Sequence, residues 1–214
     1  MSIVRFEPWI PKNLDPRCYG VRLLVLGDSH YEEDDEKPWT ELRLRVLTRY
    51  LVRRWGRRPK GRTQFFPNLY SLLTGRTWSQ LSPDNAVIWD NIFFYNYVQK
   101  LVPGGARHSP DAEMWRDAEV AFLTVLDRLR PDAVLVLGRR LWRNMLDGEL
   151  VSDDATALGR VYAFELPSGN GSVPAAHVYH PSSGRLRPLE THARMLRFLD
   201  AVKRTAPAVA TTMS

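Results

Sequence analysis

The stretch Val21-Arg22-Leu23-Leu24-Val25-Leu26-Gly27 decides the fold of this chain. It is a short, almost continuous apolar run that ends at a glycine, which is typical of a parallel strand buried on both faces. A second run of this kind, Ala133-Val134-Leu135-Val136-Leu137, ends at Gly138. Helical patterns follow both runs. The sequence therefore predicts an α/β protein with a mostly parallel sheet.

The rest of the chain continues this alternation of helices and strands. Apolar residues at helical spacing, with Gly, Pro and capping residues at the ends, predict helices over 39–55, 69–73, 111–129, 139–146 and 190–204. Pleat-forming residues predict a strand over 92–98, and a hairpin over 161–166 and 173–179. The apolar face expected for the first helix consists of Leu42, Val46, Leu47, Tyr50 and Leu51.

We expect these elements to form one domain over residues 1–204, followed by a flexible tail over 205–214. A chain of 214 residues with 44% hydrophobic content can bury one sizeable core. Strands that alternate with helices predict a three-layer α/β/α sandwich, with helices on both faces of a central, mostly parallel sheet.

Charge and cysteine content limit the classes of function. The net charge of +6 and the sequence pI near 9.7 favour a polyanionic partner, for which nucleic acid is the natural candidate. The single Cys18 excludes a disulfide framework, a Cys-ligated zinc site and a four-Cys iron–sulfur cluster within one chain. The sequence shows neither a signal peptide nor an apolar run of membrane-spanning length, so we expect a cytoplasmic protein that does not bind membranes.

Several polar residues lie just after predicted strands or near their carboxyl ends. Ligands of open parallel sheets bind beyond the carboxyl ends of the strands. We therefore expect these residues to share one edge of the sheet. They are Asp28, Ser29, His30, Asn96, Arg139 and His180.

In this order and context, four segments resemble motifs of the uracil-DNA glycosylase superfamily, across residues 21–204. Gly27-Asp28-Ser29-His30-Tyr31 resembles the first motif, and Asn96 at a strand end resembles the asparagine that reads the flipped base. Leu135-Val136-Leu137-Gly138 resembles the third core strand and its turn, and His177-Val178-Tyr179-His180-Pro181-Ser182-Ser183 resembles the closing His-Pro-Ser motif. The first motif departs from the family in having His30 near the point where a proline is expected. The cysteines of the iron–sulfur branches are missing, so the resemblance implies neither a metal nor another cofactor.

The resemblance implies a monofunctional DNA glycosylase, which flips a base out of DNA and hydrolyses its N-glycosidic bond. Such a reaction passes through an oxocarbenium-like sugar and an anionic base. Asp28 is the candidate that positions water and stabilises the cationic sugar, and His180 is the candidate that donates a hydrogen bond to the departing base. Asn96 would read one edge of this base, and Phe65 or Phe66 would stack on it. Tyr31 and His30 would form the pocket wall.

The remaining candidates would contact DNA outside the base pocket. Arg185 or Leu186 would fill the space vacated by the flipped base, and the close approach of the closing loop to DNA would need Gly184. The basic stretch Arg53–Arg62 contains too much Gly and Pro for a regular element, and we expect it to be a DNA-binding loop. The predicted DNA-binding residues are Ser182, Ser183, Gly184, Arg185, Arg57, Arg58 and Arg139.

The sequence leaves several alternatives open. The excised base is uracil or a modified base, since some members of this superfamily act as bacterial antiviral enzymes on hypermodified phage DNA. Gly27-Asp28-Ser29 also resembles the nucleophile block of GDS-type esterases with Ser29 as nucleophile, although the residue three before His180 is His177 and not the required Asp. A non-catalytic DNA-binding member of the fold is the third alternative. We expect a monomer, and a preference for single- or double-stranded DNA does not follow from the sequence.

The candidates also have purely structural interpretations. Asp28 can cap a turn, His180 can be a satisfied loop histidine, and Asn96 can bond only to neighbouring backbone. Phe65 and Phe66 can be core residues, and the Arg53–Arg62 stretch can be a solvated basic loop.

Overall fold

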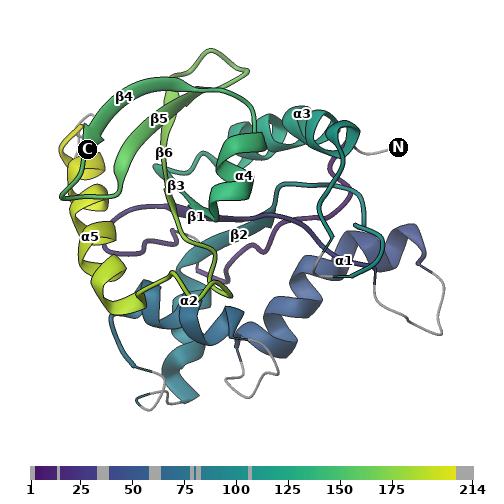
Figure 1. Ribbon diagram of the computed structural model, residues 1–214, viewed down its shortest axis with the longest axis horizontal. Helices are drawn as coiled ribbons and strands as arrows, with labels where there is room; N and C mark the ends of the chain where they lie inside the picture. Colours follow the sequence, from purple (N-terminus) through teal and green to yellow (C-terminus); the bar gives the residue numbers. More distant parts are fainter. Residues whose placement is uncertain are drawn as a thin grey trace, which may run out of the picture.

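The computed structural model describes residues 3–13, 15–32, 39–57, 64–77, 80, 83–105 and 108–205. In this part of the chain, one six-stranded sheet has the order β2-β1-β3-β6-β5-β4 (Figure 1). Neighbours among β2, β1, β3 and β6 pair in parallel, and β5 pairs antiparallel with β6 and β4. The prediction of an α/β protein with a mostly parallel sheet is confirmed. The strands are β1 (Leu23–Gly27), β2 (Ile92–Asn96), β3 (Ala133–Leu137), β4 (Glu149–Asp154), β5 (Gly159–Glu165) and β6 (Ser172–Val178).

Five α-helices lie in the described residues. Two of them begin at side-chain caps, because Thr40 accepts a hydrogen bond from Arg43 N and Asp111 accepts one from Met114 N. A π-helical turn, η1 (Val52–Gly56), extends the first helix, and the 3-10 helix η3 (Pro83–Asp90) precedes β2. The α-helices are α1 (Glu41–Leu51), α2 (Phe65–Thr74), α3 (Ala112–Leu129), α4 (Arg139–Asn144) and α5 (Pro188–Thr205).

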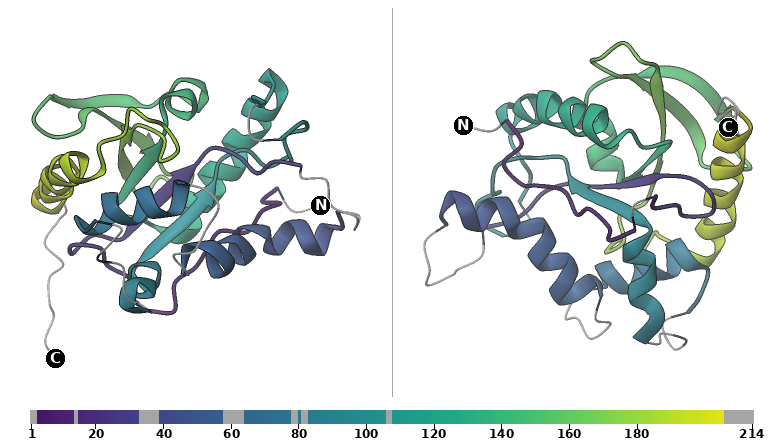
Figure 2. Two further views of the ribbon diagram at one scale, coloured as in Figure 1. Left: turned by 60° about the horizontal axis from the view of Figure 1, so that its bottom comes forward. Right: turned by 180° about the vertical axis from the view of Figure 1, so that it is seen from behind.

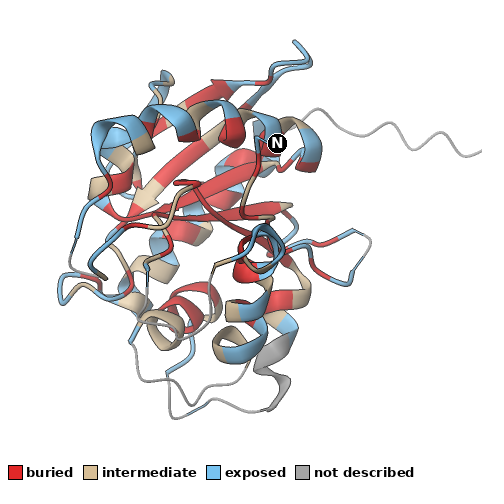
Figure 3. Cartoon of the chain, turned by 90° about the vertical axis from the view of Figure 1, so that its right-hand side faces the viewer, coloured by how far each residue is buried: buried red, intermediate tan, exposed pale blue. Residues whose placement is uncertain are grey.

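The helices cover both faces of the sheet, with a separate hydrophobic core on each. Leu23 and Val25 of β1 belong to the core that contains α2 and α5, whereas Leu24 and Leu26 belong to the core that contains α3 and α4. This alternation follows from the two-residue period of a strand. Figure 2 shows the layers from two further sides, and Figure 3 shows buried strands between helices with exposed outer faces. No helix in the described ranges is long and apolar enough to cross a bilayer.

The largest differences from the sequence-based prediction concern β4 and α2. β4 was not predicted, because all six of its residues are exposed and the strand carries no buried alternation. A β-bulge between Leu150 and Ser152 also interrupts its pairing with β5. Helix α2 begins at Phe65 and not at Leu69, so Phe65 and Phe66 lie in its first turn.

The prediction for the first helix is right for Leu47, which is buried, and wrong for three of the other residues of its expected apolar face. Leu42, Val46 and Tyr50 are exposed, and the buried side contains Leu44 and Thr48 among others. Helix α1 packs against Phe6 in a small core of its own and not in the two main cores on the faces of the sheet. A core this small covers only one side of the helix, and some of its apolar residues stay exposed. Residues 53–55 lie in a π-helical turn that continues the predicted helix, and only Gly56 of this turn falls solely in the stretch expected to be irregular. Residues 58–62 lie outside the described part.

Candidate active site

The polar residues predicted to share one edge lie at the carboxyl ends of the four parallel strands. Gly27, the last residue of β1, is in register with Asn96, the last residue of β2. The main chain beyond β1 stays paired, since Gly27 O accepts from Tyr97 N (2.9 Å) and Asp28 O accepts from Val98 N (3.0 Å). His30 O accepts from Val102 N (2.9 Å). The first motif is therefore held by backbone hydrogen bonds.

Gly27 permits a close approach of the Asn96 side chain. A Cβ atom at position 27 would lie 2.1 Å from Asn96 Oδ1 and 3.2 Å from Phe94 Cζ. No side chain fits there without displacing the amide. Position 27 therefore requires glycine, because only a residue without a side chain lets the Asn96 side chain of the neighbouring strand lie over it.

The amide of Asn96 is oriented by a buried histidine. Asn96 Nδ2 lies 3.2 Å from His30 Nδ1 and 3.3 Å from His30 Nε2, and His30 Nε2 lies 2.9 Å from Thr48 Oγ1 of helix α1. Only 4% of His30 is exposed, and this burial lowers its pKa to about 3. The ring is neutral at pH 7, so one of its nitrogens donates and the other accepts, and both lie within hydrogen-bonding distance of Asn96 Nδ2. His30 thereby fixes the direction of the Asn96 amide.

Asp28 is buried and forms an ion pair with Arg140 of helix α4. Arg140 Nε donates to Asp28 Oδ2 at 2.8 Å. The other carboxylate oxygen, Oδ1, is buried and has no hydrogen-bond partner among the described residues. An unsatisfied buried carboxylate oxygen is costly and calls for a water or a ligand group. The ion pair therefore holds the carboxylate while leaving one oxygen for another partner.

Arg140 connects Asp28 to two further segments. Its Nη2 donates to the Tyr31 hydroxyl (3.0 Å), and its Nη1 donates to Ser109 Oγ (3.0 Å) and to His108 O (3.3 Å). The sequence singled out the neighbouring Arg139 as a DNA-binding residue, and its side chain is exposed. Because β3 lies beside β1, the first turn of the helix after β3 must pass close to Asp28, and this was the signal that Arg140 or its neighbour could reach it.

His180 lies over Gly138, at the edge shared with β3. A Cβ at Gly138 would lie 3.3 Å from His180 Cβ, and the φ of +117° at this glycine also disfavours any side chain. Ser182 N donates to His180 Nδ1 (3.2 Å), so the neutral ring carries its proton on Nε2. Burial lowers the pKa of His180, and the carboxylate of Asp28 opposes this shift. The result is a neutral imidazole with Nε2–H as its donor.

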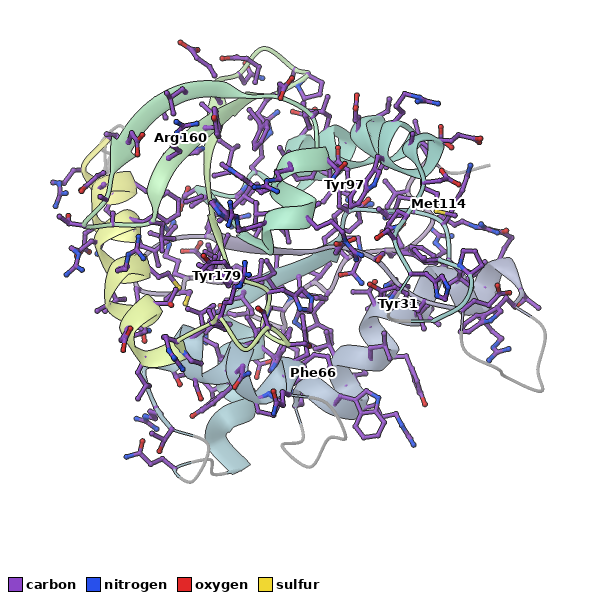
Figure 4. All side chains as sticks on the ribbon, viewed as in Figure 1. Tyr31, Phe66, Tyr97, Met114, Arg160 and Tyr179 are labelled. Carbon is purple, nitrogen blue, oxygen red and sulfur yellow. The ribbon has the colours of Figure 1, made fainter. Side chains whose placement is uncertain are left out.

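The two candidate stacking residues differ in their surroundings. Phe65 lies beside His180, with 5.3 Å between the ring centres, whereas Phe66 packs on Trp89 at 5.9 Å. Figure 4 shows Phe66 on α2, Tyr179 on the segment after β6 and Tyr31 toward α1. Of the two phenylalanines, Phe65 is the one next to a catalytic candidate.

The loop after β6 is anchored at its base and exposed at its tip. Asn68 Nδ2 of α2 donates to Pro181 O (2.7 Å), which ties the loop to the helix that carries Phe65. Ser182, Gly184 and Arg185 are exposed, and Ser183 is half-buried. Leu186 is buried in the α2–α5 core and cannot enter DNA, so Arg185 is the remaining candidate for that role.

The arginines expected in the basic stretch have different environments. Arg57 binds both carboxylate oxygens of Asp90, at 2.6 and 3.2 Å, so its guanidinium is already occupied. This geometry disfavours the predicted DNA contact of Arg57. Arg58 lies outside the described residues.

Neither a metal cluster nor a serine hydroxyl bonded to a histidine occurs in the parts of the chain that the structure describes. No three His, Cys, Asp or Glu side chains gather there as metal ligands. Ser29 Oγ is buried without a hydrogen-bond partner among these residues, and the ring nitrogens of His30 and Nδ1 of His180 have other partners. Comparison with protein-family models and with curated proteins finds no match to this chain.

Proposed function

We propose that this protein is a monofunctional DNA glycosylase similar to the uracil-DNA glycosylase superfamily, acting as a monomer in the cytoplasm. The observation that carries the proposal is the arrangement of Asp28, Asn96 and His180 at the ends of three parallel strands on one edge of the sheet. The substrate is DNA that contains uracil or a modified base. The product is an abasic site in an uncut strand, because no candidate at this edge is a lysine that could form a Schiff base.

The proposed reaction breaks the bond between C1′ of the sugar and the base nitrogen. The electron pair of this bond leaves with the base, and the sugar becomes an oxocarbenium-like cation. Asp28, whose buried Oδ1 lacks a partner among the described residues, stabilises this cation directly or through the attacking water. At an effective dielectric constant near 20, two unit charges about 4 Å apart attract by about 4 kcal/mol. Water adds to C1′ and loses a proton, and the base takes up a proton.

The departing base carries negative charge on its oxygen, which His180 stabilises. Because its Nδ1 accepts from Ser182 N, the ring presents Nε2–H as a fixed donor. A preorganised donor of this kind accelerates a reaction by about 10²- to 10³-fold. The neutral form is sufficient for this role, since the lowered pKa of His180 keeps the ring uncharged at pH 7.

Base recognition rests on Asn96 and Phe65. Asn96 offers a planar amide whose direction is set by His30, and such an amide can read one edge of a base. Phe65 is the aromatic ring nearest His180 and supplies the stacking surface. Tyr31 forms part of the wall and is held by Arg140. The exposed residues Ser182, Gly184 and Arg185 contact the phosphates and the vacated space.

The proposal is tested by measuring release of free base by mass spectrometry. The substrates are oligonucleotides with uracil, hypoxanthine, 5-hydroxymethylcytosine or its glucosylated form. We expect the wild type to release one of these bases without cutting the strand. Asp28→Asn and His180→Ala should each lower the rate about 100-fold or more while remaining folded by circular dichroism.

Ser29→Ala is the control for the esterase alternative, because Ser29 has the same local position but no assigned step. It should retain the rate of the wild type. Absence of release from every substrate would overturn the proposal, and salt-dependent DNA binding in that case would favour the non-catalytic alternative. Wild-type rates in both Asp28→Asn and His180→Ala would remove these residues from the mechanism.

A further inference from the structure

Helix α1 has an exposed apolar line on its outer side. Leu42, Val46 and Tyr50 are spaced four residues apart and are 73, 37 and 51% exposed. Residues at this spacing lie on one face of a helix. The opposite side of α1 contains the buried Leu44 and Thr48. In Figures 1 and 2, α1 lies on the rim of the molecule, and no described helix or strand covers its outer side.

Arginine and aromatic side chains extend this line at the carboxyl end of α1. The guanidinium carbon of Arg54 lies 4.8 Å from the ring centre of Trp55 and 5.9 Å from that of Tyr50. Arg53 and Arg54 follow Tyr50 by three and four residues, so they share its side of the helix. Both are exposed, and neither forms an ion pair with any described residue. Arg57, by contrast, is neutralised by Asp90.

The exposed Tyr50 and the half-buried Trp55, beside arginines that form no ion pair with a described residue, suit a single strand of nucleic acid. Bases whose faces are free stack on aromatic side chains, while arginines contact the phosphates. A duplex keeps its bases stacked on each other and gives Tyr50 and Trp55 no free base face. The net charge of +6 favours the same anionic partner.

The outer face of α1 is also close to the candidate active site. Thr48, on the inner side of the same helix, lies 2.9 Å from His30. A helix with its side chains is about 10–12 Å across. The outer face is therefore about one helix diameter from the pocket wall, within reach of the strand that continues beyond an extruded nucleotide.

We propose that the outer face of α1, made of Leu42, Val46, Tyr50, Arg53 and Arg54, binds the single-stranded DNA that flanks the target nucleotide. The identity of the partner as DNA rests on the proposed function. Tyr50 stacks on one base, and Arg53 and Arg54 contact phosphates. The protein consequently prefers single-stranded to double-stranded substrate.

The test is equilibrium binding of a fluorescent 20-nucleotide single strand and of the matching duplex, by anisotropy at several salt concentrations. The wild type should bind the single strand more tightly. Tyr50→Ala should weaken this binding about tenfold, and Tyr50→Phe, which keeps the ring, should restore it. Arg53→Gln/Arg54→Gln should reduce the slope of log K against log salt by about 0.7 for each phosphate that the two arginines neutralise in the wild type.

Val120→Ala and Arg116→Gln are the matched controls, since both residues are exposed on α3, on another side of the molecule. They should bind both DNAs as the wild type does. Unchanged affinity and salt slope in the α1 variants, an equal or greater affinity for duplex, or binding of anionic vesicles in place of DNA would each overturn the inference.

Base release by the same variants separates this inference from the proposed function. Suppose that the wild type releases a base and that Tyr50→Ala matches it in binding and in rate. The proposed role of the α1 face is then wrong, and the glycosylase proposal stands. If no base is released but Tyr50→Ala weakens binding of the single strand, the proposed role of the α1 face stands and the glycosylase proposal fails.

Discussion

Replacing Gly27 by alanine tests whether the first motif and Asn96 form one unit. The added Cβ would lie 2.1 Å from Asn96 Oδ1, whereas ordinary contact begins near 3.4 Å. The amide must therefore move by roughly 1.3 Å, because the pairing of Gly27 with β2 and its hydrogen bond from Tyr97 N hold the glycine in place. Crowding of this kind costs about 1–3 kcal/mol of unfolding free energy. A displacement of about 1 Å at a reacting group lowers kcat/KM by about 100-fold, which corresponds to about 2.7 kcal/mol.

The assay is urea unfolding followed by tryptophan fluorescence, combined with the rate of base release. Gly184→Ala is the control for stability, since a Cβ there meets no atom within 4 Å and neither glycine has a left-handed backbone. The double variant Gly27→Ala/Asn96→Ala isolates the contact. In that background the nearest atom to the added Cβ is Phe94 Cζ at 3.2 Å, which needs to yield by a few tenths of an ångström, so most of the stability cost should vanish. An equal cost of Gly27→Ala with and without the Asn96 side chain would refute the reasoning.

Two other perturbations follow from the same site. Arg140→Met should lower the unfolding free energy by about 1–3 kcal/mol, because it leaves the buried carboxylate of Asp28 without its donor. The double variant Arg140→Met/Asp28→Asn should recover part of this loss. An unfolding free energy in urea equal to that of the wild type would contradict the ion pair. The pKa of His30 is lowered to about 3 in the folded protein and is about 6.5 in an unfolded chain, so the unfolded state binds more protons below pH 6.5 and stability falls as the pH decreases. From pH 7 to pH 5 this residue should cost about 2 kcal/mol in urea unfolding, and His30→Gln should remove that part of the pH dependence. The same pH dependence in the variant would count against a buried neutral His30.

The strand ends could be predicted from the sequence because they are local features. A buried apolar run and the glycine that ends it lie within seven residues in β1 and within six in β3, so no distant information was needed. The rule that parallel strands present their carboxyl ends at one edge then brings Asp28, Asn96 and His180 together. The observed order of the sheet bears this out for their positions.

The partners of these residues could not be predicted, because each comes from a distant helix whose rotation the sequence does not set. Arg139 and Arg140 are adjacent and chemically identical, and a rotation of about 100° per residue decides which one reaches Asp28. Thr48 is a weak candidate in any sequence-based prediction, yet it is the side chain that α1 directs at His30. The error over Leu42, Val46 and Tyr50 has the same cause, since the apolar pattern of α1 does not coincide with one buried face.

The candidate site has little net charge, which suits a reaction in which the sugar becomes positive and the base becomes negative. Asp28 and Arg140 form a neutral pair overall, and burial keeps His30 uncharged and favours the neutral form of His180. In the proposed reaction the cationic sugar would be stabilised by the unpartnered Oδ1 of Asp28, while the anionic base would receive a hydrogen bond from His180. If Arg140 moved toward a DNA phosphate, Asp28 would lose its counterion and attract the sugar cation more strongly. Binding of DNA and activation of the carboxylate would then depend on the same guanidinium.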